Sequence, residues 1–172
     1  MIRLWFRIIL SAVIMVLLQT LVLNNIHIFG FVSPFIYIYV IMKLPFDVTR
    51  SGIIFVSFLI GLVVDIFSNT LGLHAAACTF MGFMRMPLLE RLFFLKEFPE
   101  RSIPSFNLFG YDKFIRYTLL LVAIHHVTLF LIESFSLFQP LLMIIRMVTS
   151  IMLTSLIILI IEAFNPGKKK SV

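Results

Sequence analysis

The sequence predicts an all-α integral membrane protein with six transmembrane helices and with both termini in the cytoplasm. Of the 172 residues, 61% are hydrophobic, and the mean hydropathy is +1.11. Soluble domains contain about 45–50% apolar residues, so lipid is the expected surrounding. The basic residues predict the topology, because Lys and Arg near the ends of spans remain on the cytoplasmic side.

The gaps between the apolar stretches alternate in charge. The gaps near 24–30, 67–72 and 135–140 contain no Lys or Arg. The N-terminus, the other two gaps and the C-terminal tail contain Arg3, Arg7, Lys43, Arg50, Arg91, Lys96, Arg101, Lys113, Arg116, Lys168, Lys169 and Lys170. We assign the formal net charge of +6 to anchoring in the membrane and to contact with anionic membrane lipids, and not to nucleic acid.

Six spans of about 20 residues leave room for short connections only, so residues 1–172 are expected to form a single transmembrane domain. The expected spans are 4–23, 28–43, 51–67, 72–89, 116–136 and 139–162, and residues 96–115 form a cytoplasmic loop. This arrangement leaves no separate soluble domain and excludes most soluble functions.

The first two expected spans each need an interpretation. The first follows basic residues, as a signal peptide does, but its apolar run ends in Asn24 and Asn25 without a small-residue cleavage site. We interpret it as an uncleaved span. Gly30 and Pro34 interrupt the start of the second, which is therefore either short or broken near its outer end.

The remaining boundaries follow from local signals. Ser51 is expected to cap the third span, and the fourth extends to 89, or to 95 if its amphipathic end is helical. Prolines and charges keep residues 96–115 from forming a span. The aromatic side chains of this loop suggest either a connector on the membrane surface or a docking segment for a partner.

Ionisable residues inside spans are costly and usually have a role. They are Asp65, Arg85, His125, His126, Glu133 and Arg146. A helix rises about 1.5 Å per residue through a core about 30 Å thick, which places Asp65 roughly 20 Å above the inner face and Arg146 roughly 10 Å below the outer face. Because these depths coincide, we expect an Asp65–Arg146 ion pair that locks two spans together, in preference to a ligand or proton role.

Other positions suggest close packing. Arg85 is expected either to extend toward the inner face or to pair with Glu90. Ser57, Gly61 and Asp65 recur at four-residue spacing, and small residues at this spacing let helices approach closely in lipid. The same spacing relates Arg146, Ser150 and Thr154 on the sixth span.

No catalytic or metal-binding pattern emerges from the sequence. His125 and His126 are adjacent, so they diverge by about 100° on a helix and cannot bind one metal from one face. His126 and Glu133 share a face but supply too few ligands. The lone Cys78 permits neither an intrachain disulfide nor a cysteine-based metal site. We therefore expect no catalytic residue, no metal and no cofactor, and a protein that is not an enzyme.

Residues 61–85, GLVVDIFSNTLGLHAAACTFMGFMR, resemble the rod shape-determining protein MreD family. The likeness lies in a Gly-apolar-apolar-apolar-Asp helix end, a short Ser/Asn turn, and Gly-Leu-His before a helix of small residues. Gly61, Asp65, Ser68, Gly72 and His74 stand at these positions. The resemblance marks the Asp65 motif and the Gly72–His74 turn as structural elements.

This resemblance implies a non-enzymatic scaffold of the bacterial cell-elongation machinery, which maintains rod shape and peptidoglycan synthesis from the cytoplasmic (inner) membrane. It implies a bundle similar to the substrate-binding S-components of ECF vitamin transporters. The implied partner is MreC, which would connect the chain indirectly to MreB filaments, to the RodA glycosyltransferase and to its partner transpeptidase. The family resemblance carries no catalytic residue.

Two alternatives remain open on the sequence alone. A small-molecule-binding S-component of an ECF-type transporter would need a polar cavity of about 300 Å³ or more, whereas a filled core of small residues would favour a scaffold. An intramembrane enzyme would need nucleophile–base pairs, which we do not find. The candidates for structural or interaction roles are Asp65, Arg146, Gly61, Gly72, His74, Arg85 and Glu133.

Overall fold

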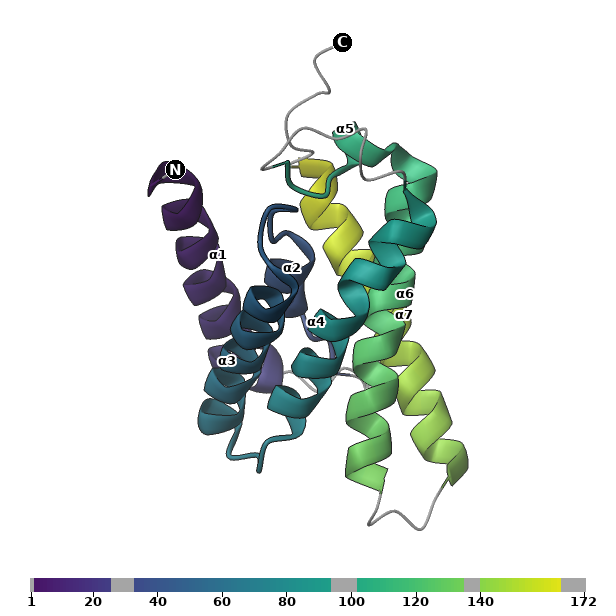
Figure 1. Cartoon of the computed structure of the whole chain (residues 1–172). Helices are drawn as coiled ribbons and strands as arrows, with labels where there is room; N and C mark the ends of the chain where they lie inside the picture. Colours follow the sequence, from purple (N-terminus) through teal and green to yellow (C-terminus); the bar gives the residue numbers. More distant parts are fainter. Residues whose placement is uncertain (1, 26–32, 94–101, 135–139, 165–172) are drawn as a thin grey trace.

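A computed structural model describes residues 2–25, 33–93, 102–134 and 140–164, which form a bundle of helices (Figure 1). The elements are α1 (Ile2–Leu21), η1 (Leu23–Asn25), α2 (Ile38–Met42), α3 (Arg50–Ser68), α4 (Leu73–Leu92), α5 (Phe106–Phe109), α6 (Tyr111–Glu133) and α7 (Pro140–Phe164). The helices α3, α6 and α7 are long and apolar enough to cross a membrane. The described part of the chain is therefore all-helical, with three helices suited by length and composition to a membrane.

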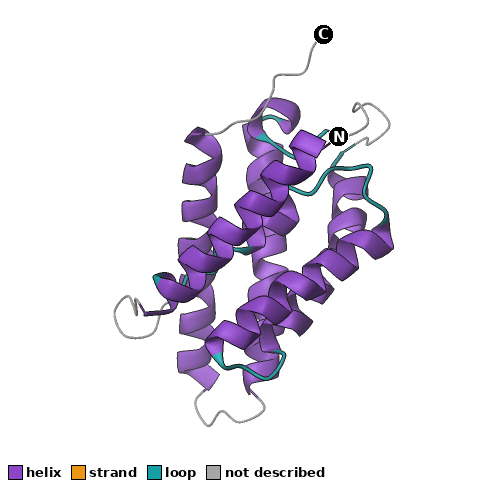
Figure 2. Cartoon of the chain, turned by 90° about the vertical axis from the view of Figure 1, so that its left-hand side faces the viewer, coloured by secondary structure: helices purple, strands orange, loops and turns teal. Residues whose placement is uncertain are grey.

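The long helices run between two ends of the bundle. α1 begins and α7 ends at the same end, which is uppermost in Figure 1 and also holds α5. The turn between α3 and α4 lies at the opposite end, and the view of Figure 2 shows the same long helices from the side. We call the upper end the basic end, because the helix termini there contain Arg50, Arg91, Lys113 and Arg116.

The short helix α2 lies inside the bundle, where it packs against α1, α3, α4 and α6. Residues 36–42 are all at most 5% exposed. The chain before them, from Ser33 to Phe35, is not helical. Over its described part, the second expected span is therefore a broken one, and residues 28–32 lie outside the described part.

The closest helix packing joins α3 to α4. Ser57, Gly61 and Asp65 are buried on one face of α3, as their spacing predicts. A Cβ added at Gly61 would lie 2.5 Å from the His74 carbonyl oxygen and 2.6 Å from the Ala75 Cα. On α4, Gly82 is packed in the same way against the Ser57 side chain. Small residues thus let these two backbones touch, which is how helices associate in lipid.

Two helix starts differ from the expectation. Thr49, and not Ser51, caps α3, because its hydroxyl accepts a hydrogen bond from the Gly52 N–H at 3.2 Å. α6 begins at Tyr111, well inside the expected 96–115 loop. Gly110 adopts φ +79°, a left-handed conformation that glycine tolerates, and this conformation lets α6 follow α5 directly. Residues 94–101 of that loop lie outside the described part.

We expect Gly61→Ala to lower the free energy of unfolding by about 1–3 kcal/mol, because the new methyl group must push two backbones apart. The loss would occur although Ala is the better helix former by about 1 kcal/mol. Thermal unfolding in detergent measures it. Ser51→Thr, which adds a methyl group at an exposed position of α3, is the control and should leave the midpoint unchanged. A Gly61→Ala midpoint equal to the control would contradict the close contact.

Candidate functional site

The interior of the bundle is organised around residues 33–44, which we call the buried segment. On either side of α2 its backbone is irregular, and in a membrane the N–H and C=O groups of irregular backbone need protein partners. Gln19 of α1, which is fully buried, supplies two of them. Its Nε2 donates to the Pro34 carbonyl at 3.0 Å, and its Oε1 accepts from the Ile36 N–H at 2.9 Å. One amide side chain thus replaces the hydrogen bonds that a continuous helix would make.

Hydroxyl groups of α7 satisfy the beginning of the same segment. The Phe35 N–H donates to Thr154 Oγ1 at 3.1 Å, and the Ser33 N–H donates to Ser150 Oγ at 3.3 Å. Ser150 and Thr154 are both buried and lie four residues apart, on the face that their spacing predicted. The polar stripe of α7 therefore accepts the hydrogen bonds of the N–H groups at the break in the second span.

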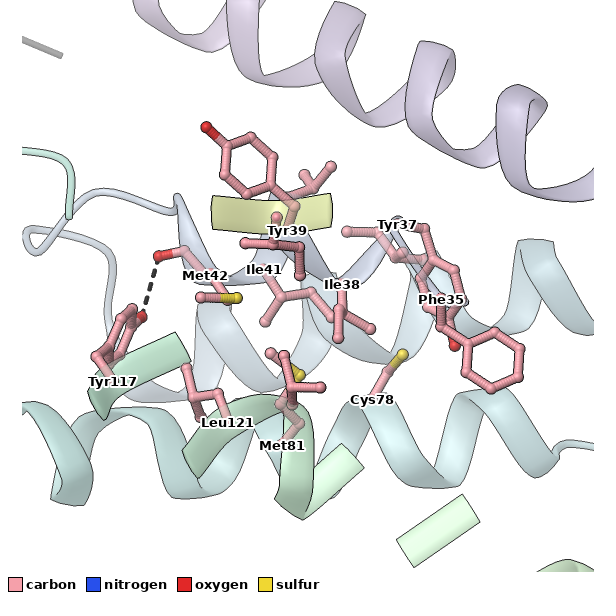
Figure 3. Packing of buried hydrophobic residues seen from close by; sticks show 14 of the residues in the cluster. Phe35, Tyr37, Ile38, Tyr39, Ile41, Met42, Cys78, Met81, Tyr117 and Leu121 are labelled. Carbon is pink, nitrogen blue, oxygen red and sulfur yellow. Dashed lines mark hydrogen bonds between the residues drawn. The ribbon is translucent and has the colours of Figure 1, made fainter. Parts of the chain in front are cut away.

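The other end of the buried segment is held by α4 and α6. The Tyr117 hydroxyl donates to the Met42 carbonyl at 3.0 Å (Figure 3). The Arg85 guanidinium, which is fully buried, donates to the Leu44 carbonyl through Nη2. A cation at the C-terminal end of a helix is favourable, and here the helix is α2. Arg85 therefore neither extends to the inner face nor pairs with Glu90, the two alternatives that the sequence suggested.

Apolar side chains fill the space beside these hydrogen bonds. Figure 3 shows Ile38 and Ile41 of α2 packed toward Met81 of α4 and Leu121 of α6. Cys78 lies in the same layer and is buried, with its sulfur toward the phenol of Tyr37. The lone cysteine is a core residue.

Tyr37 joins two histidines from different helices. Its hydroxyl oxygen lies 2.8 Å from His74 Nδ1 and 2.8 Å from His125 Nε2. A phenol donates one proton, so one imidazole accepts from Tyr37 and the other donates to it. The ring of Phe35 covers both imidazoles, with centroids 5.2 Å from His74 and 5.8 Å from His125. His125 Nδ1 is buried and has no hydrogen-bond partner.

His126 belongs to a second, directed chain of hydrogen bonds. Its Nδ1 lies 2.9 Å from the Val122 carbonyl and therefore carries the proton, because a carbonyl only accepts. Its Nε2 then accepts from the Thr154 hydroxyl at 3.2 Å. Thr154 Oγ1 in turn accepts from the Phe35 N–H. The chain thus begins at the buried segment and ends on α6.

A buried ion pair closes the basic end. Lys43 Nζ lies 2.8 Å from Glu162 Oε2, and the Glu162 side chain is fully buried. The Tyr39 hydroxyl donates to the same oxygen at 2.7 Å, and the Phe106 N–H donates to Oε1 at 3.3 Å. Lys43 also donates to the Pro104 carbonyl at 2.6 Å. Glu162 therefore ties α7 to the buried segment and to the start of α5.

Asp65 has a different partner from the expected one. Its Oδ1 accepts from the His74 N–H at 3.1 Å and its Oδ2 from the Ala75 N–H at 2.8 Å. The Thr70 hydroxyl also donates to Oδ1. Asp65 is therefore the carboxylate cap of α4, and the expected ion pair with Arg146 is wrong. That expectation matched only the depths of the two residues. In the structure, α3 packs against α1 and α4, whereas α7 packs against α6.

The other residues singled out from the sequence separate into two groups. Gly61, Gly72 and His74 join Asp65 in the α3–α4 unit, where Gly72 takes φ +79° just before α4. Glu133 at the end of α6 and Arg146 of α7 are half-buried. Neither is hydrogen-bonded to His74.

Sequence reasoning missed several of the interior residues that matter. They are Gln19, Tyr37, Tyr39 and Glu162. The usable signal was Pro34, because a broken span needs polar partners and Gln19 is a polar side chain inside the first span.

The contacts of the interior polar side chains hold the helices of the bundle together. Within the described ranges, no group of three or more His, Cys, Asp or Glu side chains is placed to hold a metal ion. Most polar groups of the described interior bind one another or the backbone, whereas four buried atoms have no hydrogen-bond partner: Arg85 Nε, Thr118 Oγ1, His125 Nδ1 and Ser155 Oγ. A groove of about 610 Å³ lies instead between α3 and α4 and is lined mainly by apolar residues such as Phe58 and Phe80.

Comparison with known proteins gives no family for this chain, since no family model, curated protein or solved structure matches it.

We expect Gln19→Leu to lower the free energy of unfolding by about 2–5 kcal/mol. The substitution leaves the Pro34 carbonyl and the Ile36 N–H buried without partners, at about 1–3 kcal/mol each. Thermal unfolding in detergent measures the loss. The control is Thr128→Val, because that hydroxyl bonds only the Ile124 carbonyl of its own helix. Equal midpoints for the two variants would show that the buried segment does not depend on Gln19.

We expect Glu162→Gln to destabilise the protein by about 3–5 kcal/mol, because it leaves the Lys43 charge in the interior without its counter-charge. The double variant Lys43→Met with Glu162→Leu should recover part of that loss. Chemical or thermal unfolding compares the variants.

The exposed pair of Arg116 and Asp112, 3.2 Å apart on α6, supplies the control. Asp112→Asn should change stability by less than about 1 kcal/mol. A loss for Glu162→Gln no larger than this control would contradict the buried ion pair.

Proposed function

We propose that this chain is a six-pass scaffold of the bacterial cytoplasmic membrane, with both termini inside. Three apolar helices are long enough to cross a membrane, and the apolar helix α1 lies beside α3. α1 begins and α7 ends at the basic end of the bundle (Figure 1). A shared end for both termini agrees with an even number of passes, and basic residues favour the cytoplasmic side.

The observation that carries a scaffold function is the use of the interior polar groups. Gln19, Arg85 and Tyr117 are bound to the backbone of the buried segment, while Tyr37 binds His74 and His125. Apart from Arg85 Nε, Thr118 Oγ1, His125 Nδ1 and Ser155 Oγ, the buried polar side chains of the described part are hydrogen-bonded, which leaves few of them to recognise a substrate. The groove of about 610 Å³ is lateral and mainly apolar, unlike the polar cavity that an S-component carrier would need.

The residues on which the likeness to the MreD family rests act together in the structure. Gly61 lets α3 touch α4, and Asp65 caps α4 at His74. Gly72 supplies the left-handed turn between them. We therefore propose a scaffold that binds MreC and through it links MreB, RodA and its partner transpeptidase in cell elongation.

Co-purification tests this proposal. The tagged chain is extracted in a mild detergent from its own bacterium, and the bound proteins are identified by mass spectrometry. An unrelated multi-pass protein with the same tag is the control. We expect MreC and the wall synthases with this chain and not with the control, and depletion of the chain should turn rods into spheres.

Two results would contradict the proposal. Recovery of an ATPase module in place of MreC would favour the carrier. A C-terminal reporter that is active outside the cytoplasm would refute the six-pass topology.

A further inference from the structure

The lateral groove between α3 and α4 has a cation at one end. Ile54, Phe58 and Leu62 form its α3 wall, and Ala76, Thr79 and Phe83 are part of its α4 wall. Ile54, Phe58 and Leu62 recur at four-residue spacing, and Arg50 stands one turn before them on the same face. The Arg50 guanidinium lies over the ring of Phe83, with its carbon 5.5 Å from the ring centroid. A charged group therefore lies at the basic end of this mainly apolar groove.

Arg50 is available to a ligand. It is exposed, and the ion pairs of the described residues do not include it. The hydrogen bonds of the described residues do not include its side chain either, so its N–H donors are available to an oxyanion while the guanidinium lies near the Phe83 ring. A planar guanidinium matches the geometry of phosphate oxygens.

The groove is at least as long as one acyl chain. From Arg50 to Leu62 a helix rises about 18 Å, and half of the hydrocarbon core is about 15 Å. The volume of about 610 Å³ falls in the range of small-ligand sites, about 300–1,000 Å³. The groove thus starts at the level of lipid headgroups and continues past the depth that one acyl chain reaches.

We propose that this groove binds one anionic phospholipid, with the phosphate on Arg50 and an acyl chain along α3 and α4. Charge complementarity favours this occupant over the transmembrane helix of a partner, since an apolar helix needs no cation at the mouth of the groove. The site rests on the membrane setting of the bundle and does not depend on the proposed scaffold function.

Lipid binding to the whole purified chain tests the proposal. The protein is delipidated in a neutral detergent and given phosphatidylglycerol or phosphatidylcholine with identical acyl chains. Native mass spectrometry follows bound lipid, and the thermal unfolding midpoint follows stabilisation. We expect one phosphatidylglycerol to be retained and to raise the midpoint by several degrees, with at least tenfold weaker binding of phosphatidylcholine.

Two variants separate the headgroup from the chain. Arg50→Gln should weaken phosphatidylglycerol at least tenfold, while Arg91→Gln, an exposed cation at the same end, should change it less than twofold. Ala76→Phe places a ring in the groove from an exposed position. It should weaken both lipids without lowering the midpoint of the lipid-free protein.

Several results would overturn the proposal. Equal binding of the two lipids, or equal effects of Arg50→Gln and Arg91→Gln, would show that Arg50 does not form a headgroup site. Stabilisation by inorganic phosphate alone that matches phosphatidylglycerol would show an anion site without a chain. If Ala76→Phe leaves lipid binding intact and abolishes co-purification of a protein partner, the groove belongs to a partner helix.

Discussion

The hydrogen bonds of the buried segment are the constraint on which the rest of this structure depends. A polypeptide that leaves helical geometry inside lipid exposes N–H and C=O groups that cost several kcal/mol each if they remain unpaired. Residues 33–37 and 43–44, on either side of α2, do so inside the bundle. Four side chains from four different long helices form hydrogen bonds with these groups: Gln19, Thr154, Arg85 and Tyr117. The positions of these helices follow from the need to reach one short stretch of backbone.

The α3–α4 unit solves a separate problem by different means. There the helices are complete, and they associate by direct backbone contact together with one carboxylate. Gly61 permits the contact, and Asp65 satisfies the first N–H groups of α4 within it. The motif from Gly61 to His74 is therefore a compact structural unit, in which Gly61, Asp65 and Gly72 each have a physical reason for their identity.

The sequence predicted the long helices well, because their apolar lengths and the gaps between them are local properties. It also flagged the broken second span through Pro34, and the small-residue face of α3 through four-residue spacing. It failed where two segments must be placed around one another. Depth along the membrane normal can be counted in residues, but the rotation of one helix about the bundle cannot, and so Asp65 was paired with Arg146. Glu162 was missed because nothing near it in the chain shows that Lys43 and Tyr39 will surround it.

The Glu162 ion pair has a consequence for biogenesis. The acid that neutralises Lys43 lies in α7, as do the hydroxyls that receive Ser33 and Phe35. During synthesis these groups emerge more than a hundred residues after the backbone they serve. The broken span therefore cannot complete its hydrogen bonds until the final helix has left the ribosome. Until then, water, lipid headgroups or the insertion machinery must bind the unpaired polar groups of the nascent chain. A nascent chain stopped before α7 would be a natural substrate for membrane quality-control proteases.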